Sequence, residues 1–591
     1  MVVDSASIDD ALSLPEVMFK TATTRALEPA QWCYHQGQYL AITYAQMASR
    51  IRHISSGLLR AGVRSGDRIA ILMENIPEWA VIDYAILSIG AVTVPLYCSS
   101  REQDIHYLLK DSGAKIVFVS GAKLLNKLFG SLEQIPHLQQ IYALEPSTHK
   151  QVASIASLEA CELDQVALDH RLGQLHRDTL ATLVYTSGTT DKPKGVMLTH
   201  GNILTNLESV PSIFALSSGT TGDRMLSFLP LAHALERTGS HFLCYSFGLS
   251  VAFAERPDTV AKNMAEAKPT LMVTVPRMLE LIRSRILGEV ARQSPVKQKL
   301  FQHYLKLAAK DKMTFLQRIF HQLLDHMIGE KIRQRFGGRV RAFICGGAPL
   351  NIEVAQFFES LGLPIIEGYG LSESAPLLSV NPMHDRRLGS VGIAGKGVEL
   401  RISDDGEILA RGSNIMPGYW KKQRESKETL RDGWLHTGDI GTLDSDGYLR
   451  ITDRKKEIII NSGGENISPQ KVEQQVLRLT EVEQVVIFGD NKPHLVAFIV
   501  ANEAACRKWG QALGLPESDW QQLCASKLLR KHLHQLINSQ LKGLNTFEQI
   551  RRIHILSMPF TMENGLLTPT LKIKRRKVFE QYAPILTELY Q

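Results

Sequence analysis

Short apolar runs alternate with longer segments of helical period through the first three quarters of this 591-residue chain. Trp79–Ser88 and Thr259–Ala267 are examples of the helical segments that lie between the apolar runs. This alternation predicts an α/β fold with largely buried β-sheets flanked by helices. The expected strands are Arg68–Met73, Ala91–Leu96, Lys115–Ser120, Leu183–Thr186, Met225–Leu229, Thr270–Val275, Arg341–Cys345 and Pro364–Glu367.

The pattern changes at two places along the chain. Residues 296–335 are rich in Lys, Gln and Leu at helical spacing, which predicts a helical insertion. After Gly412 the segments become short and punctuated by turns, and Asp446-Gly447 predicts a β-hairpin. A second, differently built domain is therefore expected in the last quarter.

Charge supports the same division. From residue 453 to the end the chain has 19 Lys and Arg and 14 Asp and Glu, a net of +5, whereas the whole chain carries +7. A basic face that is merely solvated would give the same count. We expect a large multi-subdomain N-terminal body at residues 1–452, with the insertion at 296–335, and a small mobile α+β C-terminal domain at 453–591.

Signals for export or membrane insertion are not expected. The N-terminus is acidic, without a basic segment followed by a long apolar one. The most apolar window, Phe242–Ala254, is shorter than the ~20 residues that span a bilayer, and it predicts a helix end followed by a buried strand. Seven scattered cysteines without a CxxC pair are typical of a reducing compartment rather than a disulfide framework.

The run LVYTSGTTDKPKGVMLTH at Leu183–His200 carries the most chemical information. A β-rich run leads into small hydroxyl residues and glycines, whose backbone N–H groups and hydroxyls can converge on an anion. A lysine adds positive charge, so the loop predicts a phosphate cradle, although a plain surface loop has similar composition. It is not a Walker loop, because GxxxxGK[ST] is absent. The candidate phosphate-binding residues are Thr186, Ser187, Gly188, Thr189, Thr190 and Lys194.

Seven further motifs follow in order and cover nearly the whole chain. With the first motif, they resemble the AMP-forming adenylating superfamily of acyl-CoA synthetases, nonribosomal adenylation domains and luciferases. The motifs are LSFLPLAHALERTG at 226–239, VRAFICGGAPL at 340–350, EGYGLSES at 367–374, GEILARGSNIMPGYW at 406–420, GWLHTGDIG at 433–441, ITDRKKEIIINSGGENISP at 451–469 and LTPTLKIKRRK at 567–577.

The resemblance implies a reaction in which a carboxylate joins the α-phosphate of ATP and pyrophosphate leaves. Both reactants are anions, so the site must offset their repulsion and hold them in line. Glu373 matches the Mg²⁺ carboxylate of the family, and Ser372 would donate to the α-phosphate. The implied adenine site consists of Gly346, Gly347, Ala348, Gly368, Tyr369 and Gly370.

Three residues of the last quarter match the ribose and catalytic positions of the family. Asp439 resembles the carboxylate that accepts both ribose hydroxyls, and Arg454 resembles the arginine that reaches the same sugar. Lys572 aligns with the catalytic lysine, whose ammonium offsets the repulsion between the acyl carboxylate and the α-phosphate. The four other basic residues of LKIKRRK are expected to form a solvated face.

The second half-reaction also has candidate residues. Lys456 falls where the family has its hinge between two domain arrangements, one for each half-reaction. Ser462, Gly463 and Gly464 resemble the turn that lines the pantetheine tunnel. His233 matches a position that flanks the acyl carboxylate, with a buried structural histidine as the alternative.

Two positions depart from the family pattern. Asp191 stands where the family usually has Gly, which places a carboxylate near the phosphate loop. Leu571 stands where the family often has Gly before the catalytic lysine. Long-chain acyl-CoA synthetases resemble the LTPT-x-K form of this chain more closely.

The resemblance favours a bacterial long-chain fatty acyl-CoA synthetase that uses ATP, CoA and Mg²⁺. A fatty acyl-AMP ligase that loads a carrier protein, a ligase of another carboxylic acid, a luciferase and a non-enzymatic scaffold are the alternatives. Nucleic-acid binding is not expected, because the basic run near residue 572 has no interleaved aromatic residues. We expect a cytoplasmic enzyme; contact with the inner face of a membrane and homodimer formation stay open.

Overall fold

The computed structural model describes residues 6–130, 135–186, 192–214, 222–256, 259–310, 312–455, 457–513, 519–568 and 571–591. The chain divides into two units, and their positions relative to one another are not determined. Unit 1 consists of Met1–Arg401, Leu409–Thr437 and Leu443–Leu449, and unit 2 of Ile402–Ile408, Gly438–Thr442 and Arg450–Gln591.

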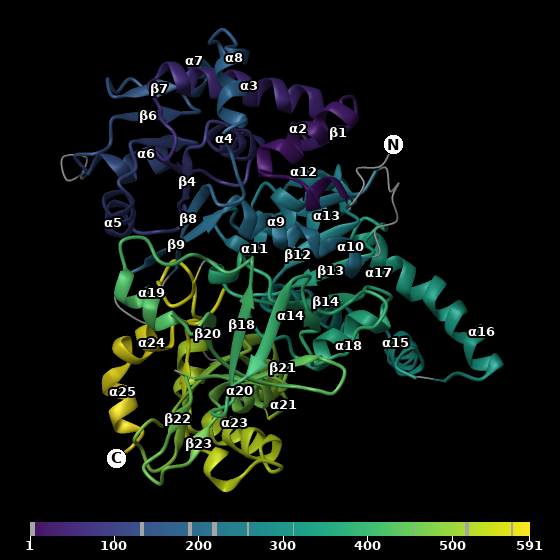
Figure 1. Ribbon diagram of the computed structural model, residues 1–591. Helices are drawn as coiled ribbons and strands as arrows, with labels where there is room; N and C mark the ends of the chain where they lie inside the picture. The colour runs from purple at the N-terminus through teal and green to yellow at the C-terminus, as the bar shows by residue number, and fades with distance from the viewer. Residues whose placement is uncertain are drawn as a thin grey trace. The chain divides into compact units, whose positions relative to one another are not determined.

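A seven-stranded sheet carries the phosphate-loop motif in unit 1 (Figure 1). Its order is β7-β6-β5-β3-β4-β8-β9, and all neighbours are parallel except β8 and β9. The central strands are buried along almost their whole length, as expected for parallel strands covered on both faces. The strands are β3 (Arg68–Leu72), β4 (Val92–Pro95), β5 (Ile116–Val119), β6 (Gln140–Ala143), β7 (Val152–Ser154), β8 (Leu180–Thr186) and β9 (Lys194–Thr199).

Alternate residues of this sheet pack on opposite faces. Ile69 and Ile71 of β3 join the apolar cluster that includes α3 and α4, whereas Ala70 and Leu72 join the cluster with α5 and α6. The helices of this region are α1 (Ala6–Asp9), α2 (Leu14–Thr24), α3 (Tyr44–Arg60), α4 (Pro77–Ser88), α5 (Glu102–Ser112), α6 (Ala122–Phe129), α7 (Ile155–Glu159) and α8 (Gln165–Leu172).

A nine-stranded sheet carries the glycine-rich motifs. Its order is β16-β15-β14-β13-β12-β10-β11-β1-β2, and the pairs from β1 through β11, β10, β12 and β13 to β14 are parallel. The strands are β1 (Pro29–His35), β2 (Gln38–Thr43), β10 (Arg224–Ser227), β11 (Ser250–Phe253), β12 (Leu271–Thr274), β13 (Ala342–Cys345), β14 (Ile365–Tyr369), β15 (Ser379–Val380) and β16 (Ile393–Ala394).

The two large sheets share one apolar core. Met225, Val251 and Val273 pack in the same cluster as Ile69 and Ile71. The helices that follow in this part of the chain are α9 (His200–Glu208), α10 (Val210–Phe214), α11 (Ala234–Glu236), the π-helix η2 (Arg237–Phe242), α12 (Leu243–Phe247), α13 (Val260–Ala267), α14 (Pro276–Ala291), α18 (Ile352–Ser360) and the 3₁₀ helix η5 (Ser372–Ser374).

The eight expected strands are all present, which confirms the α/β interpretation, and the apolar window near residue 250 contains α12 and then β11. The described part of residues 295–335, which leaves out residue 311, forms four helical elements and no strand. These elements are α15 (Pro295–Ala308), α16 (Phe315–Leu324), the π-helix η4 (Asp325–Gly329) and α17 (Glu330–Arg335). Among all the described residues, no helix is both long and apolar enough to cross a membrane.

A five-stranded sheet follows, in which β17, β18, β20 and β19 are neighbours in that order and β21 pairs with β20. The hairpin expected at Asp446-Gly447 joins β20 to β21: Asp444 N donates to Tyr448 O, and Gly447 has a φ of +81°. The elements are β17 (Val398–Ile402), β18 (Glu407–Gly412), α19 (Gln423–Thr429), β19 (Leu430–Arg431), β20 (Trp434–Leu443) and β21 (Leu449–Arg454).

Unit 2 also contains a three-stranded sheet in the order β24-β25-β26, with α20 and α23 packed on one face and α24 and α25 on the other. The strands are β22 (Ile459–Ile460), β23 (Asn466–Ile467), β24 (Val482–Phe488), β25 (Leu495–Ala501) and β26 (Ile550–Leu556). The helices are α20 (Pro469–Val476), α21 (Glu503–Ala512), α22 (Trp520–Ala525), α23 (Lys527–Gln540), the 3₁₀ helix η6 (Thr546–Glu548), α24 (Arg575–Gln581) and α25 (Ala583–Glu588). The start of the C-terminal domain at residue 453 stays a prediction.

Candidate active site

The phosphate-loop motif lies on an antiparallel hairpin in unit 1. Thr186, the last residue of β8, pairs with Lys194, the first residue of β9. The hairpin therefore fixes the two points between which the loop must run. Four of the predicted phosphate ligands and the unusual aspartate lie outside the described residues; they are Ser187, Gly188, Thr189, Thr190 and Asp191.

The segment around Tyr419 lies beside the start of β9. Trp420 N donates to Gly195 O at 2.8 Å, and Met197 N donates to Gly418 O at 3.1 Å. A Cβ on Gly195 would lie 3.3 Å from Cβ of Trp420, so the glycine permits this close approach. The hydrogen bonds place the Tyr419 ring next to the lysine of the phosphate motif.

Tyr419 connects two predicted site residues. The Nζ of Lys194 lies 5.1 Å from the centroid of the Tyr419 ring, and the Tyr419 hydroxyl donates to Oε1 of Glu373 at 2.7 Å. Burial and the neighbouring Glu373 carboxylate raise the pKa of Tyr419, so the hydroxyl stays protonated and donates. The backbone of Met416 also donates to Glu373 O at 2.9 Å. The structure thus brings the candidate phosphate lysine and the candidate metal carboxylate together.

The predicted adenine residues lie at the carboxyl ends of two neighbouring parallel strands. Cys345 of β13 pairs with Glu367 of β14, so Gly346, Gly347 and Ala348 leave the sheet beside Gly368, Tyr369 and Gly370. A Cβ on Gly346 would lie 3.3 Å from Gly368 O. Ligands of open α/β sheets bind at this edge of the sheet. The six residues therefore form one edge of a candidate nucleotide site.

The turn after β14 is tightly held. A Cβ on Gly370 would overlap the carbonyl oxygen of Pro376, so only glycine fits there. The buried Ser374 accepts a hydrogen bond from Leu371 N at 3.0 Å, and its carbonyl accepts one from Nδ2 of Asn206 at 2.9 Å. These contacts fix the 3₁₀ helix that carries Ser372 and Glu373.

His233 caps a helix next to this edge. Its Nδ1 accepts a hydrogen bond from Leu235 N at 3.2 Å, and a Cβ on Gly346 would lie 3.5 Å from the Leu235 side chain. The histidine is half-buried. It therefore has a structural role at the start of α11 and also lies close to the glycine-rich strand end.

A buried ion pair anchors the helix that follows. Arg237 donates to both carboxylate oxygens of Asp83, and His241 contacts the same carboxylate at 3.0 Å. All three side chains are almost completely buried. Burial alone would raise the pKa of Asp83, but the charge of Arg237 and the hydrogen bond with His241 lower it to about 2. Part of the LAHALERTG motif therefore belongs to the core.

The predicted ribose residues pair with each other in unit 2. The Nε of Arg454 donates to Oδ1 of Asp439 at 2.9 Å, and Asp439 is buried. The neighbouring Gly438 N donates to Oε1 of Glu407 at 2.9 Å, while Lys455 contacts Oε2 of Glu407 at 3.0 Å. This network holds the turn beside Asp439 on two sides.

Lys572 lies in the same electrostatic environment. Burial and then the charge of Arg454 lower the pKa of Lys572 to about 8, while Asp439 and Glu457 act in the opposite direction. The ammonium is thus less stable than on an exposed lysine, and it remains mostly protonated at neutral pH. A lysine that titrates near the working pH is typical of functional sites.

Contacts with Thr568 hold Lys572 in place. The backbone N and O of Lys572 bond with Thr568, and Leu571 has a φ of +61°. Leu571 therefore lies in the left-handed region, which glycine adopts without strain. Arg575, expected on a solvated face, instead forms a two-bond ion pair with Glu473 at 2.7 and 3.0 Å, because it begins α24 against that side chain.

The predicted pantetheine turn joins β22 to β23. Oδ1 of Asn461 accepts hydrogen bonds from Gly463 N and Glu465 N, both at 2.9 Å, and Gly464 has a φ of +82°. Ser462 N donates to Lys492 O at 3.0 Å. The hinge candidate Lys456 lies outside the described residues.

Tyr419, Glu407 and Lys455 are not among the site residues predicted from the sequence. Tyr419 belongs to the MPGYW motif, whose aromatic residues after Gly418 were the available signal. Its partner Glu373 is 46 residues away, and that separation hides the contact. Glu407 and Lys455 carry no motif of their own that predicts their pairing.

Among the described residues, no group of three or more His, Cys, Asp or Glu side chains could hold a metal ion. Glu373 is a single carboxylate fixed by Tyr419, and Lys194 lies beside the ring of the same tyrosine. Mg²⁺ commonly uses one or two protein carboxylates, several waters and the phosphates of its substrate. The site therefore fits Mg²⁺ that enters with a nucleotide.

Glycine-rich turns at the carboxyl ends of parallel strands, a lysine and a single carboxylate define an α/β nucleotide-binding enzyme. Family profiles identify it further: "AMP-binding enzyme" matches residues 20–420, and "AMP-binding enzyme C-terminal domain" matches residues 456–591. The chain belongs to the AMP-binding enzyme family.

Named relatives match almost the whole chain. Long-chain-fatty-acid–CoA ligase FadD15 of Mycobacterium bovis is 34% identical, over 94% of this chain and 93% of the relative. Long chain acyl-CoA synthetase 6, peroxisomal, of Arabidopsis thaliana is 31% identical, over 94% of this chain and 82% of its own.

Solved structures share the fold. The A domain of carboxylic acid reductase from Segniliparus rugosus, in complex with AMP and a co-purified carboxylic acid, has a TM-score of 0.78 at 21% identity and covers 100% of this chain and 96% of its own. ATP-bound MatB from Rhodopseudomonas palustris has a TM-score of 0.71 at 22% identity, covering 97% of this chain and 99% of its own.

Proposed function

We propose that this chain is an AMP-forming long-chain fatty acid–CoA ligase. The observation that carries the substrate class is the 34% identity, over 94% of the chain, to a relative named as a long-chain-fatty-acid–CoA ligase. The site supports the chemistry independently, because it combines glycine-rich strand ends with Lys194 and Glu373 around a hairpin suited to phosphate.

In the proposed first step, a carboxylate oxygen of the fatty acid attacks the α-phosphorus of ATP. The bond to the oxygen that bridges the α- and β-phosphates breaks, and pyrophosphate leaves. Lys194 holds the β- and γ-phosphates, Glu373 holds Mg²⁺, and Lys572 supplies an ammonium to the α-phosphate and the acyl carboxylate. Mg²⁺ supplies charge neutralisation at the phosphates.

In the proposed second step, the CoA thiol attacks the acyl carbonyl carbon, gives its proton to solvent, and AMP leaves. The C-terminal domain, from about residue 453, acts as a mobile lid that turns at Lys456. Ser462, Gly463 and Gly464 line the path of the pantetheine arm. Asp439 and Arg454 hold the ribose through both steps.

Pyrophosphate release across a panel of carboxylic acids, with and without CoA, tests this proposal. Acetate, octanoate, palmitate and benzoate separate the substrate classes. We expect the highest kcat/KM with palmitate and sustained turnover only with CoA. A preference for benzoate would indicate a ligase of another acid. Turnover that requires an acyl carrier protein instead of CoA would indicate an acyl-AMP ligase.

A further inference from the structure

Helix α16 exposes an apolar face outside the site described above. Six large apolar side chains of α16 and the following π-helix are exposed, and Phe315 and Leu316 are each 77% exposed. Their spacing places them within one face, because residues three or four apart lie above one another on a helix. The six residues, here called the α16 face, are Phe315, Leu316, Ile319, Phe320, Leu323 and Met327.

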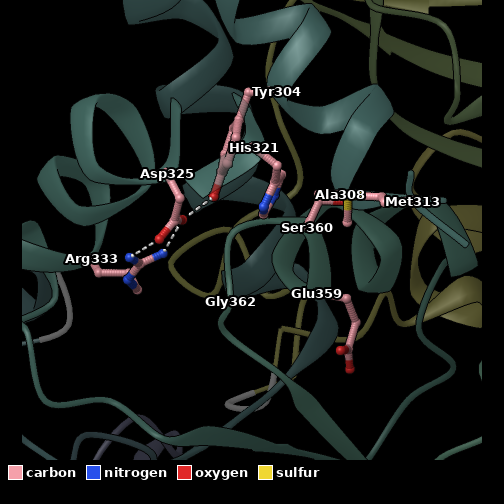
Figure 2. Close-up of a pocket in the computed structure, with 9 residues that line it drawn as sticks. All are labelled: Tyr304, Ala308, Met313, His321, Asp325, Arg333, Glu359, Ser360 and Gly362. Carbon is pink, nitrogen blue, oxygen red and sulfur yellow. Dashed lines mark hydrogen bonds and ion pairs between the residues drawn. The ribbon is translucent and has the colours of Figure 1, made fainter. Parts of the chain in front are cut away.

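The polar side of the same helical segment faces the protein. Figure 2 shows His321 and Asp325 turned toward Tyr304, with Arg333 against Asp325. The His321 and Tyr304 rings stack with centroids 5.3 Å apart, and the Tyr304 hydroxyl donates to Oδ1 of Asp325 at 2.7 Å. Two hydrogen bonds of 2.8 Å join Arg333 to the same carboxylate. These contacts fix the rotation of the helix and keep its apolar face outward.

A surface helix of a globular protein normally turns its apolar stripe toward the core and its polar side chains toward solvent. Helix α16 shows the reverse arrangement. The segment is nevertheless a well-formed helix. Thr314 and Gln317 form a reciprocal capping box at its start, and Leu324 is buried on the inner side. An apolar face of this size on an ordered element indicates a binding surface.

Charge identifies the partner. Residues 295–335 contain nine Lys and Arg and three Asp and Glu, a net of +6 in a chain whose total is +7. Most of these basic side chains are exposed, among them Lys306, Lys310, Lys312 and Arg318. A symmetric dimer through this face would bring the same positive surface against itself. An anionic lipid surface matches both the charge and the apolar side chains.

We propose that the α16 face binds an anionic lipid bilayer, with α16 lying in the plane of the interface. Phe315, Leu316 and Leu323 enter the boundary between headgroups and acyl chains, and exposed basic side chains of the same segment, such as Lys312 and Arg318, contact the phosphates of the lipids. The inference goes beyond the proposed ligase activity, since it concerns binding and not turnover.

Cosedimentation of the full chain with lipid vesicles tests the proposal. Vesicles of phosphatidylcholine alone are compared with vesicles that also contain phosphatidylglycerol. We expect binding to the anionic vesicles that weakens as salt is added. Phe315→Ser/Leu316→Ser should lower the partition coefficient at least about tenfold, because two large apolar side chains no longer enter the lipid. Absence of binding by the unaltered protein would overturn the proposal.

Matched variants separate the contribution of the apolar side chains to lipid binding from that of the basic side chains. Leu27→Ser/Val166→Ser removes two comparably exposed apolar side chains elsewhere in unit 1, and it should bind like the unaltered protein. Lys312→Gln/Arg318→Gln should weaken binding only to anionic vesicles, whereas Lys20→Gln/Lys123→Gln should not. Light scattering without lipid measures the molar mass of the protein and so tests whether the α16 face instead forms a dimer. A dimer that Phe315→Ser/Leu316→Ser dissociates would assign the face to a second copy and overturn the lipid proposal.

Discussion

The hydroxyl of Tyr419 donates a hydrogen bond of 2.7 Å to Oε1 of Glu373, while the ring of the same tyrosine faces Nζ of Lys194 at 5.1 Å. One side chain thus orients the candidate metal carboxylate and positions the candidate phosphate lysine. Partners of this kind tune a metal site without contacting the metal.

Tyr419→Phe should raise the Mg²⁺ concentration for half-maximal pyrophosphate release about tenfold, because Glu373 loses the donor that orients it. The ring is kept, so the thermal midpoint should change little. Titration of the initial rate with Mg²⁺ measures the effect. Tyr448→Phe is the control, since that hydroxyl donates to Asp385 O at 2.7 Å away from the site. An unchanged Mg²⁺ requirement in Tyr419→Phe would show that the Tyr419 hydroxyl does not position Glu373 for Mg²⁺.

Titration of Lys572 should make the rate of adenylation fall on the alkaline side of its pH profile. The pKa of Lys572 is lowered to about 8, below the value of about 10.4 in an unfolded chain, so the ammonium is lost as the pH rises through 8. The kcat/KM for pyrophosphate release should fall above that pH. Lys572→Arg keeps its charge, and its residual rate should show no limb near pH 8. A limb that persists in Lys572→Arg would assign the titration to another group.

Lys572→Ala should separate the two half-reactions. We expect loss of acyl-adenylate formation, whereas conversion of preformed acyl-AMP to the thioester continues. Lys577→Ala is the control, because Lys577 is an exposed basic residue of the same cluster. Equal loss of both half-reactions in Lys572→Ala would contradict the assignment.

Arg237→Leu should lower the free energy of unfolding by about 3–5 kcal/mol, since it leaves the buried Asp83 carboxylate without its main partner. Urea unfolding measures the loss. Arg60→Leu breaks the exposed pair with Glu162 and should cost less than about 1 kcal/mol. A similar loss of unfolding free energy in both variants would show that the buried pair stabilises the fold no more than the exposed pair does.

The same pair predicts an acid dependence. The pKa of Asp83 is lowered to about 2, so its stabilising contribution is complete above the unfolded value of about 4 and is lost as the pH falls toward 2. Unfolding of the intact protein and of Asp83→Asn across this range measures the contribution. The difference in stability between the two proteins should shrink as the pH is lowered, and a constant difference would contradict the linkage.

Gly370→Ala should destabilise unit 1 by about 1–3 kcal/mol and weaken AMP binding, because the new Cβ would overlap Pro376 O and displace the turn before Glu373. Calorimetry with AMP and thermal unfolding measure the two effects. Gly288→Ala in α14 is the control: nothing lies within 4 Å of its Cβ position, and helical alanine is favoured over glycine. Normal AMP binding by Gly370→Ala would exclude the turn from the nucleotide site.

The parallel strands were predictable from sequence because burial on both faces makes them continuous apolar runs, as in β5. The hairpin at Gly447 was predictable because its turn needs a positive φ. Two-residue strands such as β15 leave no periodic signal. Their position depends on pairing with neighbouring strands, as β15 pairs with β14 and β16.

The site shows the same limit. Gly370 and Glu373 lie within one motif, so their proximity follows from the sequence. Tyr419 meets Glu373 because backbone hydrogen bonds hold its segment against β9 and against Glu373 itself. Helical spacing predicted the segment that contains α16, but spacing alone does not say which face of a helix meets the protein. The contacts of Asp325 with Tyr304 and Arg333 decide that.

Isolation of the intermediate tests the central claim most directly. The protein is mixed with palmitate, Mg²⁺ and ATP labelled at the α-phosphate, first without CoA, and CoA is then added. We expect acyl-AMP and pyrophosphate in equal amounts before CoA, and acyl-CoA and AMP after it. Release of ADP and phosphate, or an acyl-AMP that CoA does not discharge, would contradict an AMP-forming fatty acid–CoA ligase.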